Sequence, residues 1–591
     1  MLTKKLYKLN LFGNNKDKQK IIEKLQELGV LHIADSDLDI KDLQKDKSLI
    51  GTDEISLLLL KLNFLLNELG IEKKFEIKKL PKLEHITNDT KKLLTKHYDE
   101  IKKLSDQKQI INQEIKEIIS QLNTLNKIPF KIKNTQSKKF TTTIYKSQKP
   151  LKLELPKNSI LKTIKKKETY YKITYLRENK KELEKNLRKI PIKKISLPEF
   201  ENSTTLKKEL IAKLKNKNEE LKKIKLNIQT NLSNQKNKLL FYTLCLENYY
   251  AQKIISNKFQ TSKNHFLIKG YTEQKNIDKI RQIENINLYL ELADSEGPTK
   301  LSNKNISKQF EEITKLFSIP KYGAADPTLL ITFFYPLFFG LMLSDVGYGL
   351  ILLLSTFLIH IKFKEKAKTI TTIFTLSAIS TILFGLLFGS FFGELITITP
   401  LIANSFQISF ELLIISLIIG LVHINIGIIL KIIQNINMKK KLIDYLAIAP
   451  FILIQILILL LYFRLFILSS IIALILVVIL FYTKGIFGIM DITNFFGTWF
   501  SYARILALNL ATAGVALAIN IIASKALELG VLGIILWTII IILGHTFNFV
   551  ISMIGVTINA ARLHYVEFFS QFFESGGVEF SPFKIKQKLE Q

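Results

Sequence analysis

The sequence predicts a chain of two parts. An elongated N-terminal α+β arm, with two small α/β lobes joined by an antiparallel coiled coil, precedes an α-helical polytopic membrane domain of about eight helices. The 591 residues carry a formal net charge of +32, yet 48% of them are hydrophobic. The two characters are segregated, because residues 1–325 hold a net charge of +28 and residues 326–591 only +4. The second part also contains apolar runs long enough to cross a bilayer.

This segregation excludes several classes of protein. A single soluble globule or a disordered tail protein would not contain apolar runs of that length. The single cysteine, Cys245, excludes a secreted disulfide scaffold. The first 20 residues contain no apolar targeting segment, so we expect the arm to stay in the cytoplasm. No RNA- or DNA-binding motif accompanies the lysines, so we expect no nucleic-acid partner.

The arm, residues 1–325, begins with a lobe formed by about residues 1–52 together with 261–300. Alternating apolar residues predict strands, and a helical period that stops at Gly29 predicts a helix. The expected elements of this lobe are strands at Leu6–Leu11, Val30–Ala34, Phe266–Tyr271 and Ile286–Leu292 and a helix at Asp17–Leu28.

Two long amphipathic stretches come next, at about residues 53–127 and 201–260. Neither can bury its apolar stripe alone, so we expect them to pair as an antiparallel coiled coil. Between them, β-branched and aromatic residues at Phe140–Tyr145 and Tyr170–Leu176 predict strands of a distal lobe over about residues 128–200.

The membrane domain covers residues 326–575 and is followed by a cytoplasmic tail, 576–591. Its first apolar run is too long for one upright span, and it is interrupted by a carboxylate and two glycines at Ser344–Gly349. We therefore expect two shorter helices folded back on each other. The expected spans are Leu329–Ile361 as two helices, Thr369–Phe392, Ser409–Leu430, Leu442–Phe463, Leu465–Tyr482, Phe495–Ser524 and Val531–Phe569.

The distribution of lysine orients these helices. Basic loops at Lys362–Lys368 and Lys439–Lys441 belong on the same side as the lysine-containing tail, whereas the loop at Glu394–Gln407 contains no Lys or Arg. Eight helices satisfy this pattern and seven do not. We expect a multi-pass plasma membrane protein with both termini in the cytoplasm and with lipid as its surroundings.

Two arginines lie inside apolar helices. Arg504 lies about ten residues into its run, and Arg562 is nearer the cytoplasmic end of the last one. A guanidinium is costly to bury and cannot lose its proton, so an intramembrane arginine is a candidate functional residue. The alternative is an arginine that pairs with an internal carboxylate or reaches the interface along its own side chain.

The last helix carries a polar stripe at helical spacing. Its members are His545, Asn548, Ser552, Gly555, Asn559 and Arg562. Such a stripe indicates either hydrogen bonding between helices or a hydrated path. The preceding helix has small residues on one face, which allow close approach of another backbone. These small residues are Ala507, Ala511, Gly514 and Ala518.

Three carboxylates in this half are further candidates: Asp345 in the helix break, Glu394 near the outer interface and Glu567 after Arg562. Each can equally be a wet helix end or a structural partner. His423 is better explained as a packing residue than as a ligand. The sequence contains no P-loop and no Cys/His metal spacing, so we expect no cofactor and no metal in this chain. Any ATP would be bound by another subunit.

The chain resembles a known family, subunit a or I of V-type and archaeal-type rotary ATPases. The motifs that carry the resemblance are YGAADPTLLITFFYPLFFGLMLSDVGYG, LFGLLFGSFFGE, SYARILALNLA and GHTFNFVISMIGVTINAARLHYVEFFSQFFESGG. LGVLHIADSD and FLIKGYTEQKN match more weakly, and the second lacks the Trp-Val-Pro that usually follows its glycine. The match extends over essentially the whole chain.

The resemblance implies a non-catalytic stator subunit. Its arm would dock peripheral stalk subunits, and its membrane domain would face a ring of rotating proteolipid subunits, connected through the complex to the central stalk and the catalytic ATPase subunits. Arg504 would be the essential stator arginine and Arg562 its partner. The channel-lining candidates are His545, Asn548, Ser552, Asn559, Thr512, Asn509 and Glu567. Some relatives carry His and Glu where this chain has Thr512 and Ser552.

Elementary electrostatics agrees with that role. A fixed positive charge about 4 Å from a ring carboxylate favours its ionised form by about 4 kcal/mol at an effective dielectric constant near 20. The sequence leaves open whether the ion is H⁺ or Na⁺ and whether the complex pumps or synthesises ATP. The alternative function is a stand-alone secondary transporter or channel, although no inverted repeat is evident.

Overall fold

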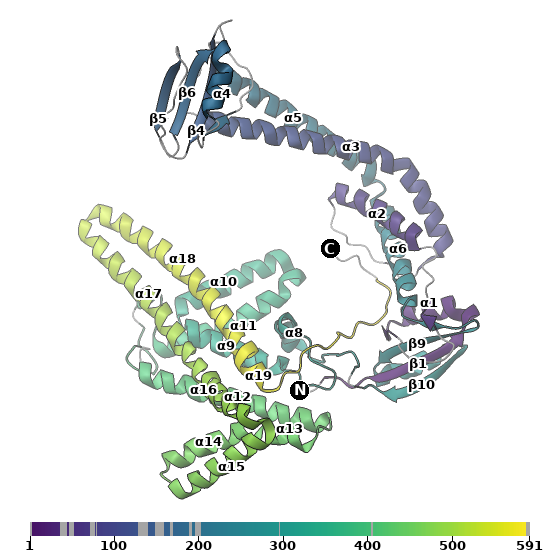
Figure 1. Ribbon diagram of the computed structural model, residues 1–591, viewed down its shortest axis with the longest axis vertical. Helices are drawn as coiled ribbons and strands as arrows, with labels where there is room; N and C mark the ends of the chain where they lie inside the picture. Colours follow the sequence, from purple (N-terminus) through teal and green to yellow (C-terminus); the bar gives the residue numbers. More distant parts are fainter. Residues whose placement is uncertain are drawn as a thin grey trace. The chain divides into compact units, whose positions relative to one another are not determined.

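A computed structural model describes residues 3–35, 44–45, 52–70, 77, 80–127, 140–147, 159–165, 169–187, 192–195, 203–294, 296–396, 398–402 and 406–586. The chain divides into two compact units (Figure 1). The first unit comprises residues 1–45 and 258–584, and the second comprises 46–257 and 585–591.

The first unit contains an antiparallel sheet formed by both ends of the arm. Its strands are β1 (Tyr7–Asn14), β2 (His32–Ala34), β3 (Gln44–Lys45), β8 (Gln260–Thr261), β9 (His265–Thr272) and β10 (Ile286–Leu292). The order is β10-β1-β9-β8-β3, with β2 also paired to β9. Leu9 on β1 lies opposite Leu290 and Gly270 on the neighbouring strands. Two helices belong to the same lobe, α1 (Lys18–Leu28) and α7 (Ile277–Arg281).

The second unit contains the paired long helices. They are α2 (Thr52–Leu69), α3 (Leu83–Lys127), α5 (Ser203–Ser233) and α6 (Lys236–Ser256). Helices α3 and α5 run antiparallel, because Lys217 forms an ion pair with Glu114 at 2.9 Å and Asn231 donates to Glu100 at 3.0 Å. Leucines and isoleucines of all four helices form one buried cluster. Cys245 lies in this cluster, where burial raises the pKa of its thiol to about 12, as expected of a packing residue.

A second antiparallel sheet lies in this unit, with the order β5-β6-β4-β7. Its strands are β4 (Phe140–Ser147), β5 (Ile160–Lys165), β6 (Thr169–Leu176) and β7 (Lys193–Ile195), and α4 (Lys180–Leu187) lies beside them. Tyr171, Ile173 and Tyr175 point to one face and pack against Leu183 of α4. The expected distal α/β lobe has this core.

The membrane half begins after a short amphipathic helix, α8 (Asn305–Phe317). Within the described residues, the chain has six apolar helical stretches of spanning length, and the shorter apolar helix Thr328–Leu343 precedes them. One of the six, Val346–Phe388, consists of two helices joined by a 3₁₀ turn, so the total agrees with the predicted number of about eight. The helices are α9 (Thr328–Leu343), α10 (Val346–Phe363), α11 (Lys368–Phe388), α12 (Ser409–Asn437), α13 (Leu442–Leu446), α14 (Ala449–Tyr462), α15 (Phe466–Lys484), α16 (Ile489–Phe500), α17 (Arg504–Ala526), α18 (Val531–Arg562) and α19 (Phe569–Phe572).

The break predicted in the first apolar run separates α9 from α10. Ser344 has a φ of 26° and Asp345 caps α10, so the chain changes direction there. Helices α9 and α11 both begin beside α8, and α10 runs back along α11. The expected pair of helices therefore does not pack face to face, because α11 packs extensively against both of them.

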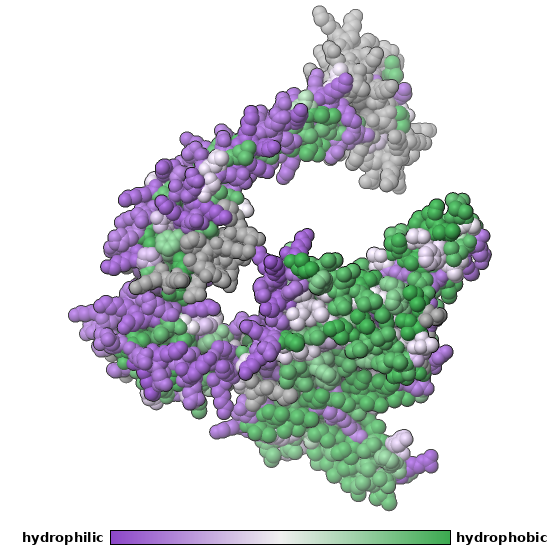
Figure 2. Space-filling model, turned by 180° about the vertical axis from the view of Figure 1, so that it is seen from behind, coloured by the Kyte–Doolittle hydropathy of each residue, from purple (hydrophilic) through white to green (hydrophobic). Residues whose placement is uncertain are grey.

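Figure 2 displays the segregation of polar and apolar side chains that the sequence indicated. Apolar side chains cover the helices of the membrane half, whereas hydrophilic side chains cover the lobe and the long helices. The fold class predicted from the sequence, a polytopic helical membrane domain with a mixed α/β arm, is confirmed.

Candidate functional site in the membrane half

Arg504, Arg562 and Glu567 form a charged cluster in the membrane half. Arg504 begins α17, where its Nη1 lies 3.6 Å from Oε1 of Glu567. The Nε atom of Arg562, the last residue of α18, lies 3.9 Å from the same oxygen. The Glu567 side chain is 2% exposed, against 24% for Arg504 and 52% for Arg562. One buried carboxylate therefore holds two arginines from different helices.

A local departure from α-helical geometry places Glu567 there. Residues Leu563–Phe568, which come directly after α18, form a π-helical turn. In an α-helix, side chains three or four residues apart share a face, and a residue five positions on points elsewhere. The wider π turn joins residues i and i+5, and such turns recur at functional sites. It therefore allows Glu567 to approach Arg562, five residues before it in the sequence.

The cluster has a formal net charge of +1, and its hydrogen bonds are incomplete. Nη1 of Arg504 and Oε2 of Glu567 are both buried, and neither has a hydrogen-bond partner among the described residues. A buried polar atom without a partner is costly. The interior of the cluster therefore contains one unused donor atom and one unused acceptor atom.

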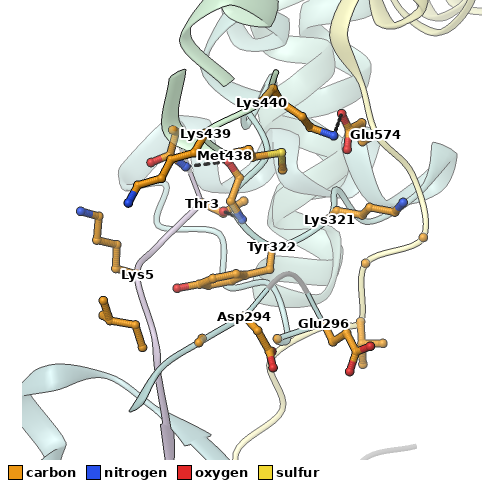
Figure 3. A pocket seen from close by; sticks show the side chains of 18 residues that line it. Thr3, Lys5, Asp294, Glu296, Lys321, Tyr322, Met438, Lys439, Lys440 and Glu574 are labelled. Carbon is orange, nitrogen blue, oxygen red and sulfur yellow. Dashed lines mark hydrogen bonds and ion pairs between the residues drawn. The ribbon is translucent and has the colours of Figure 1, made fainter. Parts of the chain in front are cut away.

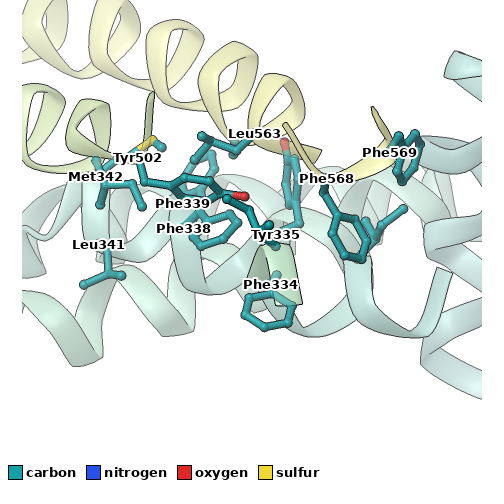
Figure 4. Packing of buried hydrophobic residues seen from close by; sticks show 14 of the residues in the cluster. Phe334, Tyr335, Phe338, Phe339, Leu341, Met342, Tyr502, Leu563, Phe568 and Phe569 are labelled. Atoms are coloured by element: carbon teal, nitrogen blue, oxygen red, sulfur yellow. The ribbon is translucent and has the colours of Figure 1, made fainter. Parts of the chain in front are cut away.

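Aromatic rings pack around the π turn (Figure 4), and the imidazole rings of His423 and His564 pack against Phe568. His423 on α12 forms a 2.8 Å hydrogen bond through Nδ1 with the hydroxyl of Tyr502, and its ring stacks on Phe568 at a centroid distance of 4.0 Å. The Nδ1 of His564 lies 2.8 Å from the carbonyl oxygen of Ala560. These fully buried rings fix the turn that carries Glu567. His423 packs and forms a hydrogen bond, in agreement with the role expected from the sequence.

A second polar group lies further along α18. His545 contacts the Tyr348 hydroxyl through Nδ1 and the Asn520 side-chain oxygen through Nε2, both at 2.9 Å. Asn548 donates to the same hydroxyl at 2.9 Å and to the backbone oxygen of Thr512 at 3.1 Å. Ser552 donates to Asn548 at 3.2 Å. This part of the predicted stripe is therefore a buried network that connects α10, α17 and α18.

The remaining members of the polar set lie apart from that network. Asn559 donates to the carbonyl oxygen of Gly555 on its own helix at 2.8 Å. Asn509 donates to the Leu341 carbonyl oxygen at 2.8 Å and to the Ser344 hydroxyl at 2.5 Å, which attaches α17 to the end of α9. Its Oδ1 atom is buried without a partner among the described residues. Asn509 therefore has an unused acceptor one turn from Arg504.

Asp345 is buried and fully engaged in local structure. Its carboxylate caps α10 by accepting a hydrogen bond from the backbone N–H of Tyr348. It also accepts a hydrogen bond from the hydroxyl of Ser390. It also accepts from the backbone of Phe392 and Gly393 in the turn after α11. Four donors on one carboxylate are typical of a structural anchor. Neither arginine is among these partners.

Glu394 lies in that same turn, with a φ of 68° and an exposed side chain. The structure therefore places Glu394 in a connection between helices rather than in the buried charged cluster. Asp345 and Glu394 lie around the turn after α11, whereas Glu567 lies in the π turn after α18.

The face of α17 that carries Ala507, Ala511 and Ala518 is exposed. A Cβ atom added at Gly555 of α18 would meet no other atom within 4 Å, and one added at Gly514 would meet only the tip of Phe406, at 3.9 Å. Large apolar side chains, including Ile554 and Ile558, are exposed on α18. An exposed apolar face with small residues is suited to contact with other helices in the membrane.

Several residues of the site were not predicted from the sequence. They are Tyr348, Asn520, Tyr502 and His564, which connect the candidate residues to one another or to the π turn. A tyrosine or asparagine inside an apolar helix was the available signal, because a polar group in hydrocarbon needs a partner. Local pattern does not indicate which partner that is.

The fold and the site define a class of protein: a polytopic membrane protein with an α/β arm and a buried carboxylate between two intramembrane arginines. Comparison with known proteins identifies the family. A sequence profile of the V-type ATPase 116kDa subunit family matches residues 197–396. The A-type ATP synthase subunit I of Pyrococcus abyssi is 30% identical over 443 residues, which cover 68% of this chain and 67% of that protein.

The subunit I of Methanocaldococcus jannaschii is 31% identical over 392 residues, or 56% of this chain and 57% of that protein. The chain belongs to the family of subunit I of A-type and V-type ATP synthases, a membrane subunit of rotary ATPases. A crystal structure of the cytoplasmic N-terminal domain of a subunit I is similar to 48% of this chain, with 14% identity and a TM-score of 0.28.

Proposed function

We propose that this chain is the membrane stator of a rotary ATPase. It forms the ion half-channels against a rotating proteolipid ring and anchors the peripheral stalks, and so couples ATP hydrolysis or synthesis on catalytic subunits to movement of H⁺ or Na⁺. The chain itself is non-catalytic and lies in the plasma membrane with both termini in the cytoplasm. The single observation that carries the proposal is the cluster in which Glu567 holds Arg504 and Arg562.

Arg504 has the properties that such a stator needs. A ring carboxylate must lose its ion on one side of the stator and regain one on the other, and a guanidinium favours the ionised form without itself titrating. The Arg504 side chain is 24% exposed, so part of it remains accessible to a carboxylate of another chain. The exposed face of small residues on α17 allows that chain to approach closely.

The network around His545 and Asn548 lies further along α18 than the two arginines. It supports a half-channel in that part of the membrane half. Its side chains offer hydroxyl, amide and imidazole groups that can bind water or pass a proton. In this proposal, Thr512 and Ser552 contribute to a hydrated path rather than titrate, because hydroxyls do not ionise at physiological pH. Asn509 and Asn559 are candidates for the parts of the path nearer the arginines.

The proposal is tested by Arg504→Ala in the assembled complex, with ATP-driven ion uptake into vesicles as the measurement. We expect transport to be lost while the complex still assembles. Arg464→Ala is the matched control, because Arg464 is exposed in the connection between α14 and α15. Uptake that persists in the Arg504 variant would contradict the mechanism.

The alternative function, a stand-alone secondary transporter or channel, is separated by purification. A stator is recovered with a small proteolipid and with ATPase subunits, whereas a transporter is recovered alone or as a homo-oligomer. The family assignment favours the stator.

A further inference from the structure

Two cavities of the first unit differ in their chemistry. One, of about 970 Å³, is lined largely by charged and polar side chains, among them Lys439, Lys440 and Glu296 (Figure 3). The other, of about 700 Å³, lies between helices of the membrane half and is lined by apolar side chains, four threonines and His360. A ligand of this second cavity, the apolar cavity, must therefore be mainly apolar with one polar part.

Three helices form the walls of the apolar cavity. Helices α10 and α11 pack along each other (Figure 1), and between them the Thr375 hydroxyl donates to the Thr356 hydroxyl at 3.3 Å. The third wall is Ile306 of the amphipathic helix α8, which is attached to α11 by a 2.8 Å hydrogen bond from Thr369 to Gln309. The cavity is therefore bounded on three sides, unlike an ordinary groove between two membrane helices.

The polar lining residues lie toward one end of the apolar cavity. His360 is three residues before the end of α10, and Thr371 and Thr372 lie near the start of α11. Residues 362–368 contain four lysines, which mark the membrane surface because clustered charges are excluded from hydrocarbon. Leu350, at the other end, precedes His360 by ten residues, or about 15 Å of helix. The cavity therefore extends from the membrane surface into the hydrocarbon, with its polar end at the surface.

The polar end has hydrogen-bonding capacity that the chain does not use. The Thr371 hydroxyl donates to the Ala367 carbonyl oxygen at 3.0 Å, so it accepts from Nδ1 of His360, which is 3.4 Å away. This leaves Nε2 of the neutral His360 ring as an acceptor. The Thr372 hydroxyl has no hydrogen-bond partner among the described residues. The polar end therefore offers one donor and one acceptor to a ligand.

We infer that the apolar cavity binds one acyl chain of a membrane phospholipid, whose ester carbonyl oxygen accepts a hydrogen bond from the Thr372 hydroxyl. A phospholipid has the polarity that the cavity requires, with its ester groups near the membrane surface and its chains in the hydrocarbon. The lysines of residues 362–368 attract an anionic headgroup collectively, as clustered basic residues beside a helix end do. The inference does not rest on the stator mechanism, because Arg504, Arg562 and Glu567 do not line the cavity.

A membrane helix of another subunit fits the apolar cavity less well. Over about 15 Å of its length, an α-helix about 10 Å across occupies about 1,200 Å³. The cavity has only about 700 Å³. An acyl chain is thinner and bends, so it can enter between α8 and the two membrane helices. The volume therefore favours lipid over a protein helix.

The test uses the full chain in nanodiscs whose phosphatidylglycerol carries a diazirine in the middle of one acyl chain. After irradiation, mass spectrometry of the peptides locates the labelled residues. Labelling at Leu350, Leu354 and Leu376 should exceed labelling of the exposed faces of α14 and α15 several-fold, because a bound chain stays beside its site. Equal labelling of all these helices would indicate ordinary surrounding lipid and would overturn the inference.

Two variants and a matched control examine the contacts. Leu354→Trp should abolish most of the labelling at Leu350 and Leu376, because the larger ring occupies the cavity. Thr372→Val keeps the shape without the hydroxyl and should reduce labelling about two- to tenfold, the range for one hydrogen bond. The control is Leu358→Trp, on the same helix and similarly exposed, at 57% against 60% for Leu354, but outside the cavity. It should be labelled as the wild type is.

Equal labelling of the Leu354→Trp and Leu358→Trp variants overturns the lipid site, and wild-type labelling of Thr372→Val overturns the assigned hydrogen bond. Leu354 and Leu358 are both exposed, so neither substitution should disturb the fold. In native membranes, a photoreactive phenylalanine in place of Leu354 should cross-link to lipid. A cross-link to another protein chain would assign the cavity to a helix of that chain and would also overturn the inference.

Discussion

At Glu567 a single carboxylate oxygen lies within 4 Å of two guanidinium groups, at 3.6 Å and 3.9 Å. Arg504 and Arg562 would repel each other in a medium of low dielectric constant, so the carboxylate between them stabilises their proximity. Glu567 therefore acts on Arg504 as a positioning residue. In the proposed mechanism, Glu567 fixes the position of the Arg504 guanidinium before a carboxylate of another chain approaches.

Glu567→Gln should lower ATP-driven ion transport by about ten- to a hundredfold, because the arginine loses its orienting charge and a displacement of about 1 Å has effects of that order. Transport is measured in vesicles that contain the assembled complex. Glu567→Asp keeps the charge on a shorter side chain and should retain more transport than Glu567→Gln. A purely steric role predicts the reverse order, because Gln has nearly the shape of Glu.

The control for this residue is Glu528→Gln, an exposed carboxylate just after α17. It should leave transport within a factor of two of wild type. If Glu567→Gln transports as well as that control does, Glu567 does not position Arg504.

At the scale of elements, the sequence predicted the features that depend on local pattern. Length and hydropathy located the helices, and the Asp-Val-Gly-Tyr-Gly break located the reversal between α9 and α10. The pattern did not predict that α11 packs against both helices, because that depends on side chains more than twenty residues away, as where Ser380 meets Gly340. Nor did it predict the π turn. A π turn adds one residue to a helical turn, and the spacing of apolar residues before and after that residue is nearly unchanged.

The same limit applies to the candidate site. Arg504 and Arg562 could be found from the sequence because a charge in an apolar run is conspicuous on its own. Their proximity to Glu567 could not be derived, because it depends on the π turn and on the rings packed around it. Asp345 could be recognised as a carboxylate in a break, but its four donors come from two separate segments.

Glu273 at the end of β9 is a second residue that no local pattern marks. It is buried and accepts a hydrogen bond from Lys4 at 2.7 Å and another from Lys300. Burial alone would raise the pKa of Glu273, but the two lysines outweigh it and lower the pKa from 4.5 to about 2. This carboxylate connects the start of β1, the end of β9 and the chain after β10.

A pKa that is lower in the folded state stabilises the fold above pH 4.5, and that contribution is lost as the pH falls through about 2. Glu273→Gln should therefore destabilise the lobe by about 2 kcal/mol at neutral pH, a value reduced for the partial exposure of the lysines. It should also reduce the acid dependence between these two pH values. Amide exchange of β9 from pH 6 to pH 2 measures both effects.

Glu291→Gln is the matched control, because Glu291 on β10 pairs only with Lys8 among the described residues, at 3.5 Å, and is more exposed. It should change stability by less than about 0.5 kcal/mol. An equal response of the two variants to pH would show that the Glu273 cluster contributes nothing specific.

At the scale of the whole molecule, the chain after the last membrane helix returns to the N-terminal lobe. Glu579 forms a parallel bridge with Thr299, and the backbone of Ser581 pairs with Nδ1 of His32 at 3.0 Å. The Phe583 amide donates to the Leu31 carbonyl oxygen at 2.8 Å. This segment follows α19, so its hydrogen bonds connect the chain at the end of the membrane half to the lobe. Residues 579–583 of the tail predicted from the sequence are therefore a structural part of the lobe.

A chain truncated after Val578 should lose three or more of these hydrogen bonds, each of which contributes about 0.5–1.5 kcal/mol. Amide exchange at His32–Ala34 should then be about ten- to a hundredfold faster, because local opening of β2 costs less free energy. A chain truncated after Lys586 keeps every one of these contacts and is the control. If both truncated chains exchange at the wild-type rate, the tail merely lies beside the lobe. If amide exchange is faster only in the shorter chain and ion transport by the complex also falls, the tail provides a connection between the lobe and α18 that transport requires.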